Sequence, residues 1–268
     1  MSVATTRVAQ LFGSKPLIGV IHLPPLPGFA GSPGIAAVVE KALADQRALE
    51  AGGMHGILVE NEEDHPHEVL AGPSTIAHMT RVAVALVERA SVPVGVEILL
   101  NDPKASLAVA AASGAAFIRT DYFVDRMTRT EYGEMAIDAA GLIAYRRRLS
   151  AEHILVFADL QVKYARMLEP RSLRESAEIA FASGADAVVV TGTETGAAPG
   201  VEEVRSASAG ASGPVLIGSG LTSQNADALL TVAGGAIVGT ALKTGHRVDV
   251  EKVRVLMQVA RSVSPDGT

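Results

Sequence analysis

Eight short apolar segments alternate with helix-like stretches along this chain of 268 residues, and this alternation limits the possible folds more than any other feature. The segments are β-branched and almost continuously apolar, which is typical of parallel strands buried on both faces. We expect strands at Leu17–Ile21, Gly56–Glu60, Val94–Ile98, Phe117–Thr120, Ile154–Ala158, Ala187–Thr191, Val215–Gly218 and Ala236–Gly239.

The stretches between these strands are expected to be helices, and several end in a glycine that can turn the chain into the next strand. The expected helices are Ile35–Ala51, Pro73–Ala90, Pro103–Ser113, Met135–Leu149, Ser172–Ser183, Val201–Ser208, Ser223–Val232 and Asp249–Ser262. Eight strand–helix units favour a (β/α)8 TIM barrel over a doubly wound sheet. We expect a single domain over residues 1–268, with residues 1–15 as a short N-terminal extension.

Composition excludes several classes of protein. The net charge is −6 without a basic run, which argues against nucleic acid as a partner. The chain has no cysteine, so disulfides and thiolate metal sites are excluded. No long apolar run predicts membrane insertion, and residues 1–15 do not resemble a secretion signal. We therefore expect a cytoplasmic protein, and we expect it to form a homo-oligomer.

Two loops of small residues follow the last two expected strands. Glycines let a backbone approach a phosphate closely, and barrels often hold phosphate after strands seven and eight. The predicted phosphate-binding residues are Gly218, Ser219, Gly220, Gly239 and Thr240. The alternative is that these glycines only permit tight turns at packed strand ends.

Polar residues gather at the ends of the other strands, where barrel enzymes place their chemistry. Asp159 and Lys163 are the central catalytic candidates, and His22, Glu97 and Asp121 are further acid–base candidates. The candidate ligand-binding residues are Glu60, Asn61, Arg119, Gln161, Thr191 and Thr195. The alternative for any single residue is an internal salt bridge, such as Arg119 with Glu97 or Asp121.

The sequence identifies no cofactor with certainty, but Glu97 and Asp121 are candidate metal ligands. If Glu97 and Asp121 converge, both cannot stay ionised in a dry pocket without a cation between them. That cation would be Mg²⁺ on oxygen ligands or the guanidinium of Arg119. The loop from Asn61 to Glu68 also carries His65 and His67 as metal-ligand candidates, although such charged loops are usually solvated.

Several short motifs of this chain resemble those of the BtpA/SgcQ family, over about residues 17–261. The matching segments are 18–28 (IGVIHLPPLPG), 59–61, 117–119, 157–159 with Lys163, 190–196, 218–220 and 237–243. The resemblance implies a phosphate-binding type of TIM barrel. It also implies a connection either with photosystem I biogenesis, for which the founding member is named, or with sugar metabolism.

The chain also departs from the family pattern. Glu97 and Asp121 stand where the family usually has asparagine, Tyr164 replaces a histidine, and Glu62 and Glu63 replace a Phe-Gly pair. These changes make the expected pocket more acidic.

Two functions follow as hypotheses. The first is an enzyme acting on a small phosphorylated metabolite, a sugar phosphate or nucleotide-like sugar, by acid–base isomerase, lyase or glycosyl-transfer or hydrolysis chemistry. The second is a non-catalytic assembly or ligand-sensing factor. Convergent acid–base residues beside the phosphate loops favour the enzyme.

Overall fold

The computed structural model describes residues 2–194 and 196–263, and in them eight parallel strands close into a barrel, which confirms the predicted fold. The strands follow one another around the barrel in the order β1-β11-β10-β9-β7-β4-β3-β2. Their bounds are β1 (Leu17–His22), β2 (Gly56–Glu60), β3 (Val94–Glu97), β4 (Phe117–Thr120), β7 (Leu155–Leu160), β9 (Ala187–Val190), β10 (Val215–Ile217) and β11 (Ala236–Val238).

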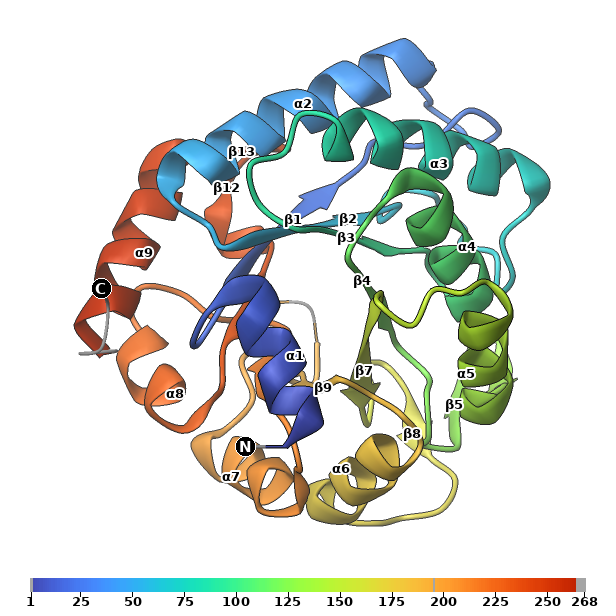
Figure 1. The fold of residues 1–268 in the computed structure, drawn as a ribbon. Helices are drawn as coiled ribbons and strands as arrows, with labels where there is room; N and C mark the ends of the chain where they lie inside the picture. Colours follow the sequence, from blue (N-terminus) through green and yellow to red (C-terminus); the bar gives the residue numbers. More distant parts are fainter. Residues whose placement is uncertain (1, 195, 264–268) are drawn as a thin grey trace.

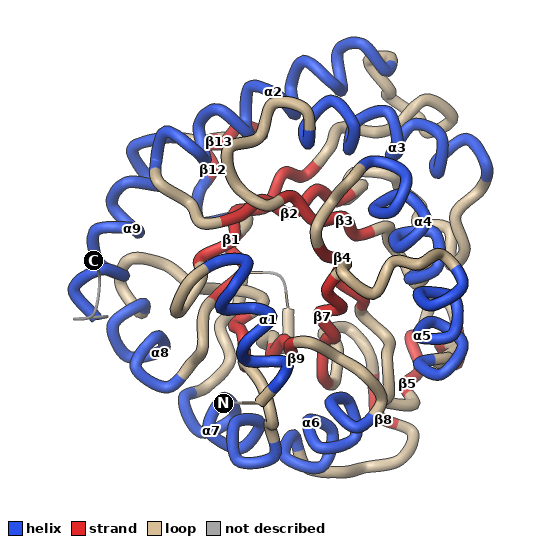
Figure 2. The backbone as a smooth tube through the Cα atoms, viewed as in Figure 1, coloured by secondary structure: helices blue, strands red, loops and turns tan. Residues whose placement is uncertain are grey.

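Helices surround the barrel, as Figures 1 and 2 show. They are α2 (Ile35–Gly52), α3 (Pro73–Val87), α4 (Pro103–Ser113), α5 (Ala139–Arg148), α6 (Leu173–Ala182), α7 (Val201–Gly210), α8 (Ala226–Val232) and α9 (Val250–Val263). The predicted start of the helix expected at Met135–Leu149 was wrong. Asp138 caps α5 by accepting a hydrogen bond from the Gly141 N–H, so the helix begins only at Ala139.

Alternation along each strand divides the core into two layers. Outward residues such as Ile118 and Val156 pack against the helices. Inward residues such as Phe117 and Phe157 fill the barrel, where their rings stack with centroids 4.9 Å apart. This alternation also decides which residues at the strand ends face the interior.

The N-terminal extension is a structural part of the barrel. Helix α1 (Val3–Phe12) lies across the end of the barrel where the strands begin (Figure 1). Val8 and Phe12 are buried, and the Phe12 ring meets the Phe117 ring edge-on at 5.4 Å. The helix therefore closes the floor and leaves the opposite end as the open mouth.

Short strands border that mouth. A three-stranded sheet has the order β6 (Gly133–Met135), β5 (Met127–Arg129) and β8 (Arg166–Met167). A 3₁₀ turn, η1 (Thr240–Leu242), follows β11 and leads into the hairpin β12 (Lys243–Thr244) and β13 (Arg247–Val248). Among the described helices, none has both the length and the apolar character needed to cross a membrane.

Candidate functional site

The last inward position of each strand forms one polar layer at the mouth. Six of the eight strands contribute a polar side chain there, and β10 and β11 contribute glycines. The layer is His22, Glu60, Glu97, Arg119, Asp159, Thr191, Gly218 and Gly239. All eight residues were candidates in the sequence, because the alternation of a buried strand identifies its inward positions.

Arg119 is the centre of this layer. Its Nε and Nη2 donate to the two carboxylate oxygens of Asp159 at 2.8 and 2.7 Å. Its Nη1 lies 3.4 Å from Glu60 Oε1 and 3.5 Å from Glu97 Oε2. All four residues are at most 5% exposed, so the expected internal salt bridge exists and is larger than a pair.

The carboxyl groups around Arg119 have opposite protonation tendencies. Burial raises the pKa of Glu97 well above its ordinary value, and Arg119 only partly opposes this effect. Burial also acts to raise the pKa of Glu60, but Arg119, His22 and a hydrogen bond with Glu97 hold it below its ordinary value. These surroundings favour the neutral form of Glu97 and the ionised form of Glu60.

The magnesium ion expected between Glu97 and Asp121 stays a prediction. Arg119 supplies the positive charge beside Glu97, and this arrangement is the alternative to the metal. Over residues 2–194 and 196–263, no three histidine, aspartate or glutamate side chains are grouped to hold a metal ion. That result covers His65 and His67, whose rings lie 4.6 Å apart. Their neighbour Asp64 accepts hydrogen bonds from Leu26 N and Asn61 Nδ2.

A cavity of about 180 Å³ lies above this layer. Both small-residue loops line it, together with five side chains that carry protons or charge: His22, Glu60, Glu62, Arg119 and Lys163. The strand-end glycines keep the space open. A Cβ on Gly239 would lie 3.0 Å from His22 Nε2, and one on Gly218 would lie 2.8 Å from the Thr191 methyl carbon.

The loop after β10 is fixed by its own bonds. Ser219 Oγ donates to Ala197 O at 2.9 Å and accepts from Gly192 N at 3.0 Å, so its hydroxyl joins two loops instead of facing an anion. Gly220 has a φ of +68°, and a Cβ there would lie 2.1 Å from Ala198 N. Backbone N–H groups, rather than the Ser219 hydroxyl, are therefore the anion donors that this loop can offer.

Lys163 and Asp159, the central catalytic candidates, lie in different parts of the site. Lys163 lines the cavity that also contains Gly220 and Thr240. Asp159 is held by Arg119 and is only 2% exposed, so it cannot reach a ligand in the cavity without leaving the guanidinium. It is a positioning residue for Arg119.

Other candidates are engaged by the loops. Gln161 has a φ of +48°, which ends the strand alternation and directs its side chain to Arg171 O and Ser176 Oγ. Asn61 accepts a hydrogen bond from Leu99 N at 2.8 Å and is buried. Thr191 is buried, and among the described residues its hydroxyl has no hydrogen-bond partner. The candidate Thr195 lies outside the described residues.

Three ionisable groups at the mouth have pKa values that their surroundings shift. Burial and the charge of Glu60 raise the pKa of Glu62 to about 7. Burial and the charge of Asp159 raise the pKa of Asp121 to about 6. Burial lowers the pKa of His22 to about 4 despite Glu60, whose Oε2 lies 3.6 Å away, so the imidazole is neutral at pH 7. Carboxyl groups that titrate near neutral pH are suited to general acid–base work.

Glu62 and Lys243 were absent from the predicted site. Glu62 belongs to an acidic segment that sequence alone assigns to solvent, and Lys243 is two residues beyond the second glycine loop. Lys243 lies with His22 and Thr240 around a neighbouring cavity of about 280 Å³. Burial and the charge of Lys41 lower the pKa of Lys243 to about 8.

The fold and the polar mouth define a TIM barrel whose candidate site lies at the C-terminal ends of its strands. The sequence pattern of the BtpA family matches residues 13–262, and the chain belongs to that family. It is 37% identical over 247 residues to the photosystem I biogenesis protein BtpA of Synechocystis sp., covering 90% of this chain and 85% of the relative. An uncharacterized protein of Archaeoglobus fulgidus is 36% identical over 247 residues, covering 92% of this chain and 99% of the relative.

The fold is also similar to solved barrels. (S)-3-O-geranylgeranylglyceryl phosphate synthase from Thermoplasma acidophilum, solved with sn-glycerol-1-phosphate, superposes with a TM-score of 0.61. The match covers 98% of this chain and 100% of the synthase at 19% identity, so it concerns the fold alone.

Proposed function

We propose that this protein is an enzyme that acts on a small phosphorylated metabolite, a sugar phosphate or nucleotide-like sugar. The observation that carries the proposal is the composition of the mouth cavity. The glycine loops after β10 and β11 line the same cavity as His22, Glu60, Glu62 and Lys163. An anion on the loop N–H groups would thus lie beside groups that transfer or hold protons.

The proposed roles follow from charge and protonation. Glu62 and Asp121 are the acid–base groups, because their raised pKa values lie near neutrality. Lys163 holds the phosphate or an anionic intermediate. Arg119, Asp159 and Glu97 form the buried support beneath them. The reaction class is isomerisation, lyase chemistry, or glycosyl transfer or hydrolysis. The expected homo-oligomer stays a prediction, which light scattering tests.

Phosphate binding is tested by thermal unfolding with inorganic phosphate against chloride at equal ionic strength. A ligand that binds only the folded state raises the melting temperature. We expect such a rise for the wild type and a smaller one for Lys163→Met. Lys104→Met is the control, since Lys104 pairs with Asp138 on the surface at 2.7 Å. Equal thermal unfolding curves in phosphate and in chloride would rule out the anion site.

Catalysis is tested by proton exchange. Fructose 6-phosphate and ribose 5-phosphate, incubated with the protein in D₂O, should lose proton NMR signal at carbons beside their carbonyl groups. Fructose and ribose should not, and Glu62→Gln should abolish the exchange. If the protein binds phosphate but shows no exchange or turnover with such a panel of sugars, the ligand-sensing alternative is favoured. The hydrogen bond from Arg119 to Asp159 also fits that alternative, because it keeps this carboxylate from reacting with a ligand.

A further inference from the structure

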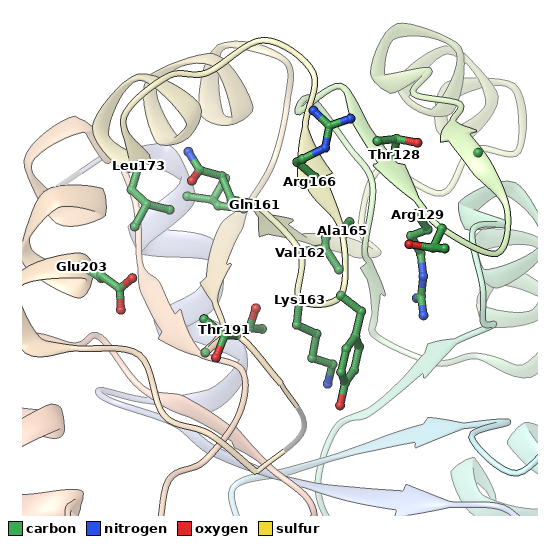
Figure 3. Close-up of a pocket in the computed structure, with 16 residues that line it drawn as sticks. Thr128, Arg129, Gln161, Val162, Lys163, Ala165, Arg166, Leu173, Thr191 and Glu203 are labelled. Atoms are coloured by element: carbon green, nitrogen blue, oxygen red, sulfur yellow. The ribbon is translucent and has the colours of Figure 1, made fainter.

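A second cavity, of about 820 Å³, opens beside the mouth. This side groove lies between the β6-β5-β8 sheet and the segments that follow β7 and β9 (Figure 3). Lys163 lines both the groove and the mouth cavity, so the two spaces meet at its side chain. No role proposed above uses the groove.

The groove is positively charged although the chain is acidic. Three cations line it, Arg129, Lys163 and Arg166, against one carboxylate, Glu203. The lining thus carries a formal charge of +2, in a protein of net charge −6. Glu203 is also occupied, because its carboxylate accepts a hydrogen bond from Gly200 N at 2.6 Å. A cationic recess attracts anions locally whatever the net charge of the molecule.

Arg129 is held in a defined position. Its guanidinium lies over the rings of Tyr132 and Tyr164, 5.6 and 5.7 Å from their centroids. Its Nε is buried and donates no hydrogen bond to any described residue. This Nε lies 3.8 Å from Glu131 Oε2, which is too long for a hydrogen bond. Aromatic faces orient this guanidinium while its N–H groups remain able to bind an anion.

Thr191 provides a second, independent indication of a ligand. It is 9% exposed, and its hydroxyl lacks a hydrogen-bond partner in the described part of the chain. A buried hydroxyl without a partner is costly, so such groups usually meet a water or a ligand. Thr191 lines the groove, and Figure 3 shows it beside Lys163.

Cavity size connects the groove with the mouth. The mouth cavity measures about 180 Å³ and the groove about 820 Å³, so the groove is the larger of the two spaces. A ligand held at the glycine loops that is larger than a phosphate group would need further space beside the mouth. The groove, reached past Lys163, offers that room.

We infer that the groove binds a second anionic group of the substrate. This inference rests on the proposed function and makes its substrate a metabolite with two anionic groups. The phosphate occupies the glycine loops, and a carboxylate or second phosphate meets Arg129 and Arg166. Lys163 lies between the two groups.

The test is an amide NMR titration of the full chain with inorganic phosphate. We expect two sets of signals to shift with separate affinities, one from residues 218–222 and 239–241 and one from residues 128–133 and 163–166. The variant Arg129→Gln/Arg166→Gln should lose the second set and keep the first. Arg205→Gln is the matched control, because Arg205 is exposed on α7 and pairs with Glu202 at 3.0 Å.

Each outcome separates the two proposals. Shifts in the first set alone, or groove shifts that survive in the double variant, would overturn the groove inference and leave the mouth site intact. Shifts in the groove set alone would disprove the phosphate site of the proposed function, and with it the doubly anionic substrate. If neither set of signals shifts, both the phosphate site and the groove site are disproved.

A second measurement joins the sites with one ligand. Fructose 1,6-bisphosphate should bind about tenfold more tightly than fructose 6-phosphate, a difference of about 1.4 kcal/mol. The double variant should bind both sugars equally. Equal affinity of the wild type for the two sugars would contradict the inference even if each sugar binds.

Discussion

At the scale of single residues, the most consequential feature is that one guanidinium holds three buried carboxyl groups. Arg119 bonds Asp159 through two hydrogen bonds and lies within 3.5 Å of Glu60 and Glu97. The sequence predicted these residues as neighbours, because strand alternation directs them inward. It could not predict which would face the ligand, since that depends on which carboxyl group captures the guanidinium.

Arg119→Met is expected to destabilise the fold by about 3–5 kcal/mol, because breaking a buried ion pair leaves an uncompensated charge. The loss should shrink at acid pH, where the carboxyl groups can take up protons. Urea unfolding at two pH values measures it. Arg126→Met is the control, because Arg126 pairs with Glu134 at 45% exposure and should cost less than about 1 kcal/mol. Equal losses for the two variants would show that the network is not the support we describe.

The pKa of Glu62 makes a pH-dependent contribution to stability. Burial raises that pKa from 4.5 to about 7, so the folded state keeps a proton that the unfolded state releases within this window. The contribution is fully present below pH 4.5 and is lost as the pH rises through 7. The free energy of unfolding of wild type minus Glu62→Gln should therefore fall from pH 4.5 to 7.5. A flat difference would mean that Glu62 is solvated.

At the scale of elements, predictability followed length and burial. Strands β2 and β4 match their expected bounds, because a buried parallel strand is a nearly continuous apolar run. Strands β5, β6 and β8 were missed, since two or three residues carry no detectable period. The small sheet that these strands form is one wall of the side groove. The groove could therefore not be predicted from the sequence.

The loop after β10 can be tested by adding a single methyl group. Gly220→Ala places a Cβ 2.1 Å from Ala198 N at a φ of +68°. Gly245→Ala has a similar φ of +61° but no atom within 4 Å of its Cβ. Both variants have the same backbone strain, so Gly220→Ala should cost about 1–3 kcal/mol more through overpacking. Equal melting temperatures for Gly220→Ala and Gly245→Ala would show that the loop after β10 can move to accommodate the added methyl group.

At the scale of the whole molecule, the barrel has one closed, apolar end and one open, polar end. Helix α1 closes one end with Val8 and Phe12, and the polar layer, the glycine loops and the groove occupy the other. The eight-unit pattern and the family were predictable because they are repeated over most of the chain. The role of residues 1–15 was not, because an isolated amphipathic helix gives no sign of what it covers.

The position of α1 has a consequence during protein synthesis. The ribosome makes this helix early, yet Val8 and Phe12 share their buried cluster with Leu216 on β10 and Ile237 on β11. At about 5–20 residues per second, the helix waits on the order of 10 to 50 s for those last strands to be translated. During that interval the apolar face of the helix, formed by Val8 and Phe12, lacks its final partners on β10 and β11.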